Sequence, residues 1–340
     1  MSQKYDIAII GATGAVGEAI LNILEEREFP IGKLYPLASK RSAGKTVLFR
    51  NKPLMVQDLA EFDFTQTQFA FFSAGGSVSA KFVPKATEAG CIVIDNTSRF
   101  RYEADVPLVI AEVNPHALAD YARRNIIANP NCSTMQMLVA LKPIYDAVGI
   151  TRINVATYQS VSGAGRKGIN ELVEQTASLL NGLKIKPKAF TRQIAFNVLP
   201  QIDEFQANGY TFEEMKMVLE TQKIFEDEDI TVNPTAVRVP VFYGHSEAVN
   251  IETKDKITAE QARQLLKKAP GVIVIDKQVP GGYPTPVGDA VGQDAVYVGR
   301  IREDISHPYG LNLWIVSDNI RKGAALNAVQ IAELLIKDYF

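Results

Sequence analysis

The chemistry of this chain is expected to centre on Cys132, which lies within Asn-Pro-Asn-Cys-Ser-Thr at 129–134. A short apolar strand is predicted before it, at 125–128, and the apolar residues of 135–148 recur at helical spacing. A cysteine at such a turn faces the free N–H groups and the positive end of the helix dipole. Both favour a thiolate and can stabilise an oxyanion. Asn131 can cap the helix. A small residue that only packs at the joint is the alternative, and the polar neighbours on both sides favour a nucleophile.

A second group of chemically active side chains follows in the C-terminal half. Gln159 ends a predicted strand, Arg238 lies in a predicted strand at 235–241, and His245 stands in a glycine turn just past that strand. A histidine can take and give a proton near neutral pH, and an arginine can hold a carboxylate with two parallel hydrogen bonds. Together with Cys132 these residues form a set suited to acyl transfer through a thioester, provided that they converge in space. The other two histidines, each next to a proline, are expected to be structural.

The N-terminal region has the strand, glycine turn and helix of a dinucleotide-binding fold. A buried strand at 5–10 runs directly into Gly-Ala-Thr-Gly-Ala-Val-Gly at 11–17, and a helix follows. Gly11 would make the tight turn, Gly14 would let the backbone approach a pyrophosphate, and Gly17 would bring the helix close to the strand. The spacing is GxxGxxG rather than GxGxxG, so a glycine-rich turn without a ligand is the alternative.

The segment after the second predicted strand, at 33–38, bears on the choice between NAD and NADP. An NAD site commonly has an acidic residue there for the ribose 2′-hydroxyl. This chain continues with Ser-Lys-Arg-Ser-Ala-Gly-Lys at 39–45. Arg41 and Ser42 suit a 2′-phosphate, so NADP is predicted, with a solvated basic loop as the alternative. Arg99, in a polar turn after another predicted strand, is predicted to bind an anion rather than to be a plain surface charge.

The order of the elements predicts an α/β fold with two domains. Apolar strands alternate with helices up to about residue 128, as in a parallel sheet, whereas later strands alternate apolar and polar side chains. We predict a Rossmann-type NADP-binding domain at 1–128, completed by a C-terminal helix within 318–340. A mixed α+β catalytic and dimerisation domain is predicted at 129–317.

Composition is that of an ordinary globular protein. Of 340 residues, 46% are hydrophobic and 22% charged, and 36 basic and 38 acidic side chains give a net charge of -2. Without a basic excess, nucleic-acid binding is not expected, and no apolar run is long enough for a membrane span. Cys91 and Cys132 are too few for a disulfide framework or a metal-ligand set. No signal-peptide pattern is recognised, so a cytoplasmic location is expected.

Across nearly its full length the chain resembles the aspartate-β-semialdehyde dehydrogenase family. The resemblance is carried by the segments 11–17, 129–134, 159–165 (Gln-Ser-Val-Ser-Gly-Ala-Gly), 213–216 (Glu-Glu-Met-Lys) and 238–246. The cysteine segment and the arginine–histidine segment are specific together, whereas the glycine fingerprint is not. One departure is Ala236, where the family often has a cysteine, at a position without an assignable chemical role.

The resemblance implies reduction of L-aspartyl-4-phosphate by NADPH to L-aspartate 4-semialdehyde and phosphate, in the biosynthesis of lysine, methionine, threonine and isoleucine. By the same resemblance Cys132 forms the thioester, His245 is the acid/base, and Gln159 orients the thiol. Arg238 would hold the substrate α-carboxylate and Glu213 its ammonium group. It also implies a fold like that of glyceraldehyde-3-phosphate dehydrogenase, a homodimer with a tetramer as the alternative, and no metal.

The phosphate and cofactor sites are assigned by resemblance as well. Arg99, Asn131 and Lys216 would hold the phosphate. Glu213 and Lys216 are three residues apart on a predicted helix and can face one site, but Glu220 and Lys223 have the same spacing. The NADP site would be lined by Gly11, Thr13, Gly14, Ala15, Val16, Arg41, Ser42, Ser162, Gly163 and Asn319.

Three other functions are considered. N-acetyl-γ-glutamyl-phosphate reductase shares the acyl-phosphate chemistry, but Arg238 with Glu213 suits a free amino acid better than a blocked amine. Glyceraldehyde-3-phosphate dehydrogenase shares the thiol chemistry, but the carboxylate expected to select NAD is missing. A non-catalytic nucleotide-binding relative is disfavoured because the reactive residues are all present.

Overall fold

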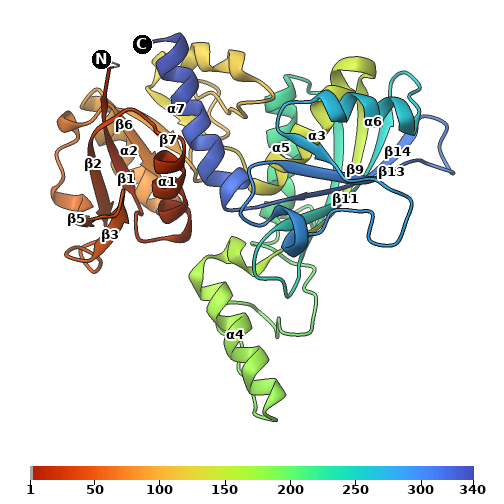
Figure 1. The fold of residues 1–340 in the computed structure, drawn as a ribbon, viewed down its shortest axis with the longest axis horizontal. Coiled ribbons are helices and arrows are strands. Elements are labelled where there is room, and N and C mark those ends of the chain that lie inside the picture. The colour runs from red at the N-terminus through yellow and green to blue at the C-terminus, as the bar shows by residue number, and fades with distance from the viewer. Residues whose placement is uncertain (1–2) are drawn as a thin grey trace. The chain divides into compact units, whose positions relative to one another are not determined.

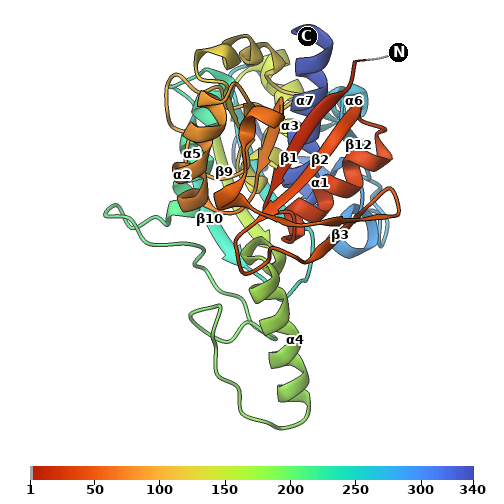
Figure 2. The same ribbon diagram turned by 90° about the vertical axis from the view of Figure 1, so that its left-hand side faces the viewer.

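The computed structural model describes residues 3–340, which form two compact units (Figures 1 and 2). Unit 1 consists of 3–131 together with 324–340, and unit 2 consists of 132–323. Each unit contains a six-stranded sheet. The α/β fold class predicted from the sequence is confirmed, with a parallel sheet in unit 1 and a mixed sheet in unit 2.

The sheet of unit 1 has the strand order β5-β2-β1-β6-β7-β8, and its pairings are all parallel. Its strands are β1 (Tyr5–Ile10), β2 (Ile31–Ala38), β5 (Gln57–Asp58), β6 (Phe69–Phe72), β7 (Ile92–Asp95) and β8 (Ile126–Ala128). The inner strands are apolar at almost every position because helices cover both faces of such a sheet. The chain order on either side of β1 is that of a Rossmann fold.

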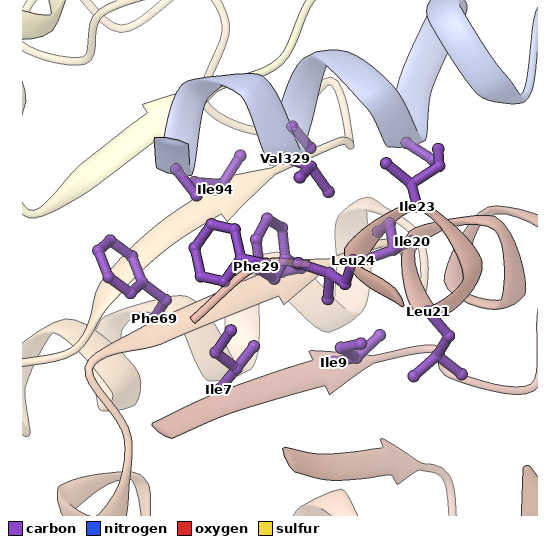
Figure 3. Packing of buried hydrophobic residues seen from close by; sticks show 14 of the residues in the cluster. Ile7, Ile9, Ile20, Leu21, Ile23, Leu24, Phe29, Phe69, Ile94 and Val329 are labelled. Atoms are coloured by element: carbon purple, nitrogen blue, oxygen red, sulfur yellow. The ribbon is translucent and has the colours of Figure 1, made fainter. Parts of the chain in front are cut away.

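The remaining elements of unit 1 flank this sheet. They are α1 (Ala15–Glu26), α2 (Gly76–Glu88), α7 (Asn327–Asp338), the hairpin β3 (Thr46–Phe49) and β4 (Lys52–Met55), and the 3-10 turns Leu59–Glu61, Phe64–Gln66 and Pro115–Arg123. Figure 3 shows α7 lying over the sheet, with Val329 near Ile94 of β7 and Ile23 of α1 on the same side. Burying a side chain such as Val329 contributes about 1.5–3 kcal/mol, so the C-terminal helix is an integral part of this core.

The glycine turn after β1 has the geometry that its spacing indicated. Gly11 has φ +89°, a conformation that favours glycine, and its N–H donates to Leu37 O at 2.9 Å. A Cβ on Gly17 would lie 2.3 Å from Gly11 O, so only glycine lets α1 pack this closely. The turn thus delivers the chain from the strand end directly to the N-terminus of α1, where Gly14 is the N-cap.

The sheet of unit 2 has the order β10-β9-β11-β14-β13-β12. Its strands are β9 (Ile150–Gln159), β10 (Thr231–Arg238), β11 (His245–Thr253), β12 (Val272–Val274), β13 (Val296–Glu303) and β14 (Gly310–Ser317). Two pairs, β9 with β10 and β12 with β13, are parallel, and the other neighbours are antiparallel. The sequence prediction of a strand at 235–241 was wrong at both ends, because β10 stops at Arg238 to begin the turn toward His245.

Helices cover one face of this second sheet. Unit 2 contains α3 (Cys132–Val148), α4 (Arg166–Leu180), α5 (Phe212–Phe225), α6 (Ala259–Lys268), the turn Val161–Ala164 and the π-helical turn Pro286–Ala290; a second π-helical turn, Arg321–Leu326, leads into α7. The helix α3 packs on β9, β11, β13 and β14 between α5 and α6, whereas α4 projects away from the sheet (Figures 1 and 2). None of the helices within 3–340 combines the length and apolarity needed to cross a membrane.

Candidate active site

Cys132 is the first residue of α3 and follows Asn131 directly. Its side chain is partly exposed, unlike the fully buried Cys91 of unit 1. A Cβ on Gly323 would lie 2.7 Å from the Cβ of Cys132, so the space beside the thiol requires a glycine. The reactive thiol position predicted from the strand-to-helix pattern is therefore found at the start of a helix, where free N–H groups favour the thiolate.

The sheet of unit 2 brings the other three predicted residues to one edge. Gln159 is the last residue of β9, and Arg238, the last residue of the parallel strand β10, is its register partner. His245 is the first residue of β11, which runs antiparallel to β9. The prediction placed His245 just past a strand, but it begins one, directly after Gly244, which has φ +84°. Strand ends that meet at one edge explain how residues so far apart in sequence converge.

A buried carboxylate joins Gln159 to the helix α5. Gln159 Nε2 donates to Glu213 Oε1 at 3.2 Å, and Lys216 Nζ donates to Glu213 Oε2 at 2.9 Å and to Asp203 Oδ2 at 3.0 Å. Of the two Glu-x-x-Lys pairs on this helix, the one that bonds Gln159 is Glu213 with Lys216. The other pair includes Glu220, which is fully buried.

The charged groups of this buried cluster shift one another's pKa values. Burial lowers the pKa of Arg238 from its ordinary 12.5, while the negative charges of Glu213 and Cys132 act in the opposite direction. Burial alone would lower the pKa of Lys216, but the carboxylates of Glu213 and Asp203 raise it above 10.5. The guanidinium of Arg238 lies within electrostatic reach of the thiol of Cys132, and its positive charge favours the thiolate.

His245 is fully buried and neutral at physiological pH. Burial lowers its pKa to about 3, and the positive charge of Arg238 acts in the same direction; Glu213 and the backbone of Gly244 oppose them. Within residues 3–340 its Nε2 has no hydrogen-bond partner. A Cβ on Gly163 would lie 3.5 Å from Nε2 and 2.7 Å from Arg238 Nη1, so this glycine leaves room for both groups.

Two further predicted residues, Asn319 and Ser162, are hydrogen-bonded to each other, and Asn319 also bonds the residue before His245. Asn319 Oδ1 accepts hydrogen bonds from Ser162 Oγ at 3.1 Å and from the N–H of Gly244 at 3.0 Å. Ser162 is buried within the turn that follows Gln159. These contacts connect the predicted cofactor residues of unit 2 to the loop that carries His245.

Outside the glycine turn, four of the predicted site residues belong to unit 1, where two are exposed and two are buried. Arg99 is exposed and its Nη1 lies 2.7 Å from Glu103 Oε1, so binding an anion would require exchange of this ion pair. Arg41 is exposed in the turn after β2, and Ser42 beside it is buried. Asn131 is buried, as are most residues of the turn that precedes it.

Arg101, for which no role was predicted, holds the turn before Cys132. Arg101 Nε donates to Asn129 O at 2.8 Å and Nη2 donates to Asn96 O at 2.9 Å. Asn327 Nδ2 also donates to Asn129 Oδ1 at 2.6 Å, so the C-terminal helix helps to fix the turn. The feature of the sequence that could have identified Arg101 is that it is a second arginine, two residues after Arg99. No cluster of three or more His, Cys, Asp or Glu that could hold a metal ion occurs in the described part of the chain.

Comparison with known proteins assigns both parts of the chain to one family. Residues 6–121 match the family model "Semialdehyde dehydrogenase, NAD binding domain", and residues 141–322 match "Semialdehyde dehydrogenase, dimerisation domain". The aspartate-semialdehyde dehydrogenase of Shewanella sp. (strain DB6705) is 64% identical over 340 residues, with 100% of both chains covered. The chain belongs to the aspartate-semialdehyde dehydrogenase family. It is therefore an oxidoreductase of amino-acid biosynthesis with a domain for a nicotinamide cofactor.

Solved structures of aspartate-semialdehyde dehydrogenases agree with this membership. The crystal structure of aspartate semialdehyde dehydrogenase II complexed with ASA from Vibrio cholerae has a TM-score of 0.98 and 62% sequence identity, with 100% of both chains covered. The enzyme with NADP from Candida albicans has a TM-score of 0.76 and 26% identity, covering 98% of each chain. The family and the enzyme class expected from the sequence are confirmed, and the two rival enzymes are set aside.

Proposed function

We propose that the enzyme reduces L-aspartyl-4-phosphate to L-aspartate 4-semialdehyde, with NADPH as the reductant and release of phosphate. The observation that carries the proposal is the buried group around the thiol: a nucleophile at a helix start, Arg238 for a carboxylate and Glu213 for an ammonium group. An amino acid with a reactive side-chain carbonyl is complementary to all three. The ASA complex of the Vibrio cholerae relative supports the same substrate.

In the proposed mechanism the thiolate of Cys132 attacks the acyl carbon and expels phosphate, which leaves a thioester. When bound, NADPH would supply a hydride to the thioester carbon. The thiohemiacetal on Cys132 would then collapse to the aldehyde and regenerate the thiolate. Overall one proton is taken up, and it ends on the released phosphate. Gln159 orients the thiol and the intermediates, and His245 is the group that donates or accepts a hydrogen at the reacting oxygen.

Substrate binding is assigned to five polar or charged side chains. Arg238 holds the α-carboxylate with two hydrogen bonds, and Glu213 holds the ammonium group. Lys216, Arg99 and Asn131 are proposed as the phosphate ligands. For Lys216 the support is its raised pKa and its contact with Glu213, whereas for Arg99 and Asn131 the support is the family resemblance.

The N-terminal domain fits a dinucleotide. The φ of +89° at Gly11, the close contact at Gly17 and the N-terminus of α1 after Gly14 supply the turn and helix end that bind a pyrophosphate. We assign NADP rather than NAD because no carboxylate occurs within 39–45, the stretch that follows β2 and contains Arg41 and Ser42. The remaining proposed cofactor ligands are Thr13, Ala15, Val16, Ser162, Gly163 and Asn319.

The deciding experiment is NADP⁺ reduction by L-aspartate 4-semialdehyde, with and without inorganic phosphate, followed by NADPH absorbance. Phosphate-dependent NADPH formation is the expected result. Turnover with N-acetylglutamate semialdehyde instead would replace the proposed substrate. Lack of turnover with either aldehyde would contradict the proposed chemistry altogether.

A homodimer in the cytoplasm completes the proposal. The dimerisation domain matched by the family model supports self-association, and the sheet face opposite α3 is available for it. That face carries a polar row across its strands, in which Asn233, Asn154, Asn250 and Asn312 are hydrogen-bonded in turn. Sedimentation equilibrium should show a species of twice 37.3 kDa; a 37.3 kDa species alone at micromolar concentration would refute the dimer.

A further inference from the structure

Ser160 bonds four residues of the proposed site, although no role was predicted for it. Its carbonyl oxygen accepts from Arg238 Nη1 at 2.8 Å, and its N–H donates to His245 Nδ1 at 3.1 Å. Its Oγ lies 3.1 Å from the same ring nitrogen, 3.1 Å from Asn319 Oδ1 and 2.9 Å from Ser162 Oγ. The residue is fully buried, so water does not compete for these bonds.

The backbone bond decides which ring nitrogen carries the hydrogen. A backbone N–H can only donate, so His245 Nδ1 must present its lone pair to Ser160. In a neutral imidazole the hydrogen is then on Nε2. The ring is neutral here because burial and the nearby Arg238 hold its pKa far below 6.5, and the Glu213 carboxylate does not offset them.

The Ser160 hydroxyl is a second candidate donor to the same nitrogen. It also lies within hydrogen-bond distance of Asn319 Oδ1 and of Ser162 Oγ, but Asn319 Oδ1 already accepts from the N–H of Gly244 at 3.0 Å and from Ser162 Oγ at 3.1 Å. The geometry therefore lets the hydroxyl donate to Nδ1 as well as to these two oxygens. When it donates to Nδ1, it adds to the backbone N–H in disfavouring the alternative tautomer, in which Nδ1 would carry a hydrogen and face the Ser160 N–H.

We propose that Ser160 is a positioning residue that holds His245 as the Nε2–H tautomer, so that the ring meets the substrate as a hydrogen-bond donor. The proposal deepens the function proposed above and rests on it. The Nε2 atom is buried, has no partner within 3–340, and lies with Arg238 Nη1 beside Gly163. Negative charge develops on the substrate carbonyl oxygen when a thiolate adds, and a fixed N–H donor stabilises that charge.

The tautomer can be observed directly in the full-length protein labelled with ¹⁵N-histidine. Long-range ¹H–¹⁵N spectra at pH 7 distinguish a protonated from an unprotonated ring nitrogen, and only three histidines contribute. The His245 signals are assigned by their loss in His245→Asn. We expect a protonated Nε2 and an unprotonated Nδ1. A hydrogen on Nδ1, alone or together with Nε2, would overturn the proposal. This spectrum needs no substrate, so its outcome is independent of whether the proposed reaction is correct.

Replacement of the hydroxyl tests the role of the side chain. Ser160→Ala keeps the backbone N–H but removes one of two donors, so the Nδ1–H population should rise about 10-fold. We expect kcat to fall by about 10-fold, less than the 10²–10³ for loss of an oxyanion donor itself, with KM for the semialdehyde within about 2-fold. An unchanged tautomer ratio and kcat would overturn the role of the hydroxyl. Should this variant fail to fold, the wild-type spectrum still decides the tautomer.

Ser317 supplies the matched control. It is directly opposite His245 in the β11–β14 register, and its buried Oγ has no hydrogen-bond partner within 3–340. Ser317→Ala removes a buried hydroxyl next to the histidine without removing a bond to it. We expect the His245 spectrum and kcat to stay at wild-type values. Effects as large as those of Ser160→Ala would show that any hydroxyl deletion here disturbs the ring and would overturn the specific role of Ser160.

Discussion

Burial of His245 in neutral form should make the protein lose stability as the pH falls from 7 to 5, and His245→Asn should remove much of that loss. The folded pKa of about 3 lies far below 6.5, so within this range the unfolded chain binds more protons than the folded chain. The free energy of unfolding therefore falls as the pH falls. Asn is chosen because its Oδ1 can still accept the Ser160 N–H that now bonds Nδ1.

The magnitude follows from the two pKa values. For an unfolded pKa of 6.5, protonation of the unfolded state contributes about 0.2 kcal/mol at pH 7 and about 2 kcal/mol at pH 5. The folded state stays neutral over this range. Between pH 7 and pH 5 the free energy of unfolding of the wild type should therefore fall by about 2 kcal/mol more than that of His245→Asn. The packing lost in His245→Asn lowers the free energy of unfolding of this variant by about 1–3 kcal/mol at every pH.

Urea unfolding at pH 7, 6 and 5 measures this difference. The only tryptophan, Trp314, lies on β14 in the same unit as His245 and reports on that unit by fluorescence. Protein concentration is held constant because association affects apparent stability. His307→Asn is the control, since His307 is a partly exposed histidine of the same unit. If wild type and His245→Asn lose stability in parallel between pH 7 and pH 5, His245 is not buried as a neutral ring.

Three further predictions concern a buried acid, the nucleophile and the cofactor. Burial raises the pKa of Glu247 well above 4.5, with Gln136 opposing. Above pH 4.5, and until the carboxyl ionises in the folded state, the wild type should lose stability relative to Glu247→Gln by about 1.4 kcal/mol per pH unit; parallel urea-unfolding curves would refute this. Cys132→Ser should abolish turnover while NADPH binding, followed by fluorescence, stays within about 2-fold; equal loss of both would show a structural role. Arg41→Asp should lower kcat/KM for NADP relative to NAD by about 10-fold or more; an unchanged preference in initial-rate assays would remove this residue from the 2′-phosphate site.

Local patterns in the sequence were sufficient for several features of the fold and site. The strand and glycine turn at 5–17 predicted the β1–α1 unit because Gly11 and Gly17 satisfy steric requirements within one short stretch of chain. The position of Cys132 at a helix start followed from the same kind of local argument. Helix periodicity and turn residues depend on near neighbours, so both were readable without tertiary information.

Convergence of the site depended on contacts between distant strands. The pairing of β10 with β9, and of β9 with β11, places Arg238, Gln159 and His245 at one sheet edge, and no local pattern encodes that pairing. The same is true of the choice of Glu213 over Glu220, which depends on the packing of α5 against β10.

The sequence by itself determined the fold class, and it predicted the position of the candidate nucleophile at a helix start, because short segments and their spacing carry that information. Only the tertiary structure decided that His245 is buried, neutral and hydrogen-bonded at Nδ1 by Ser160. The protonation state of a side chain depends on the groups that surround it in three dimensions. Those groups come from the residue after β9, from α5 and from the end of β10, and Ser160 lies 85 residues from His245 along the chain.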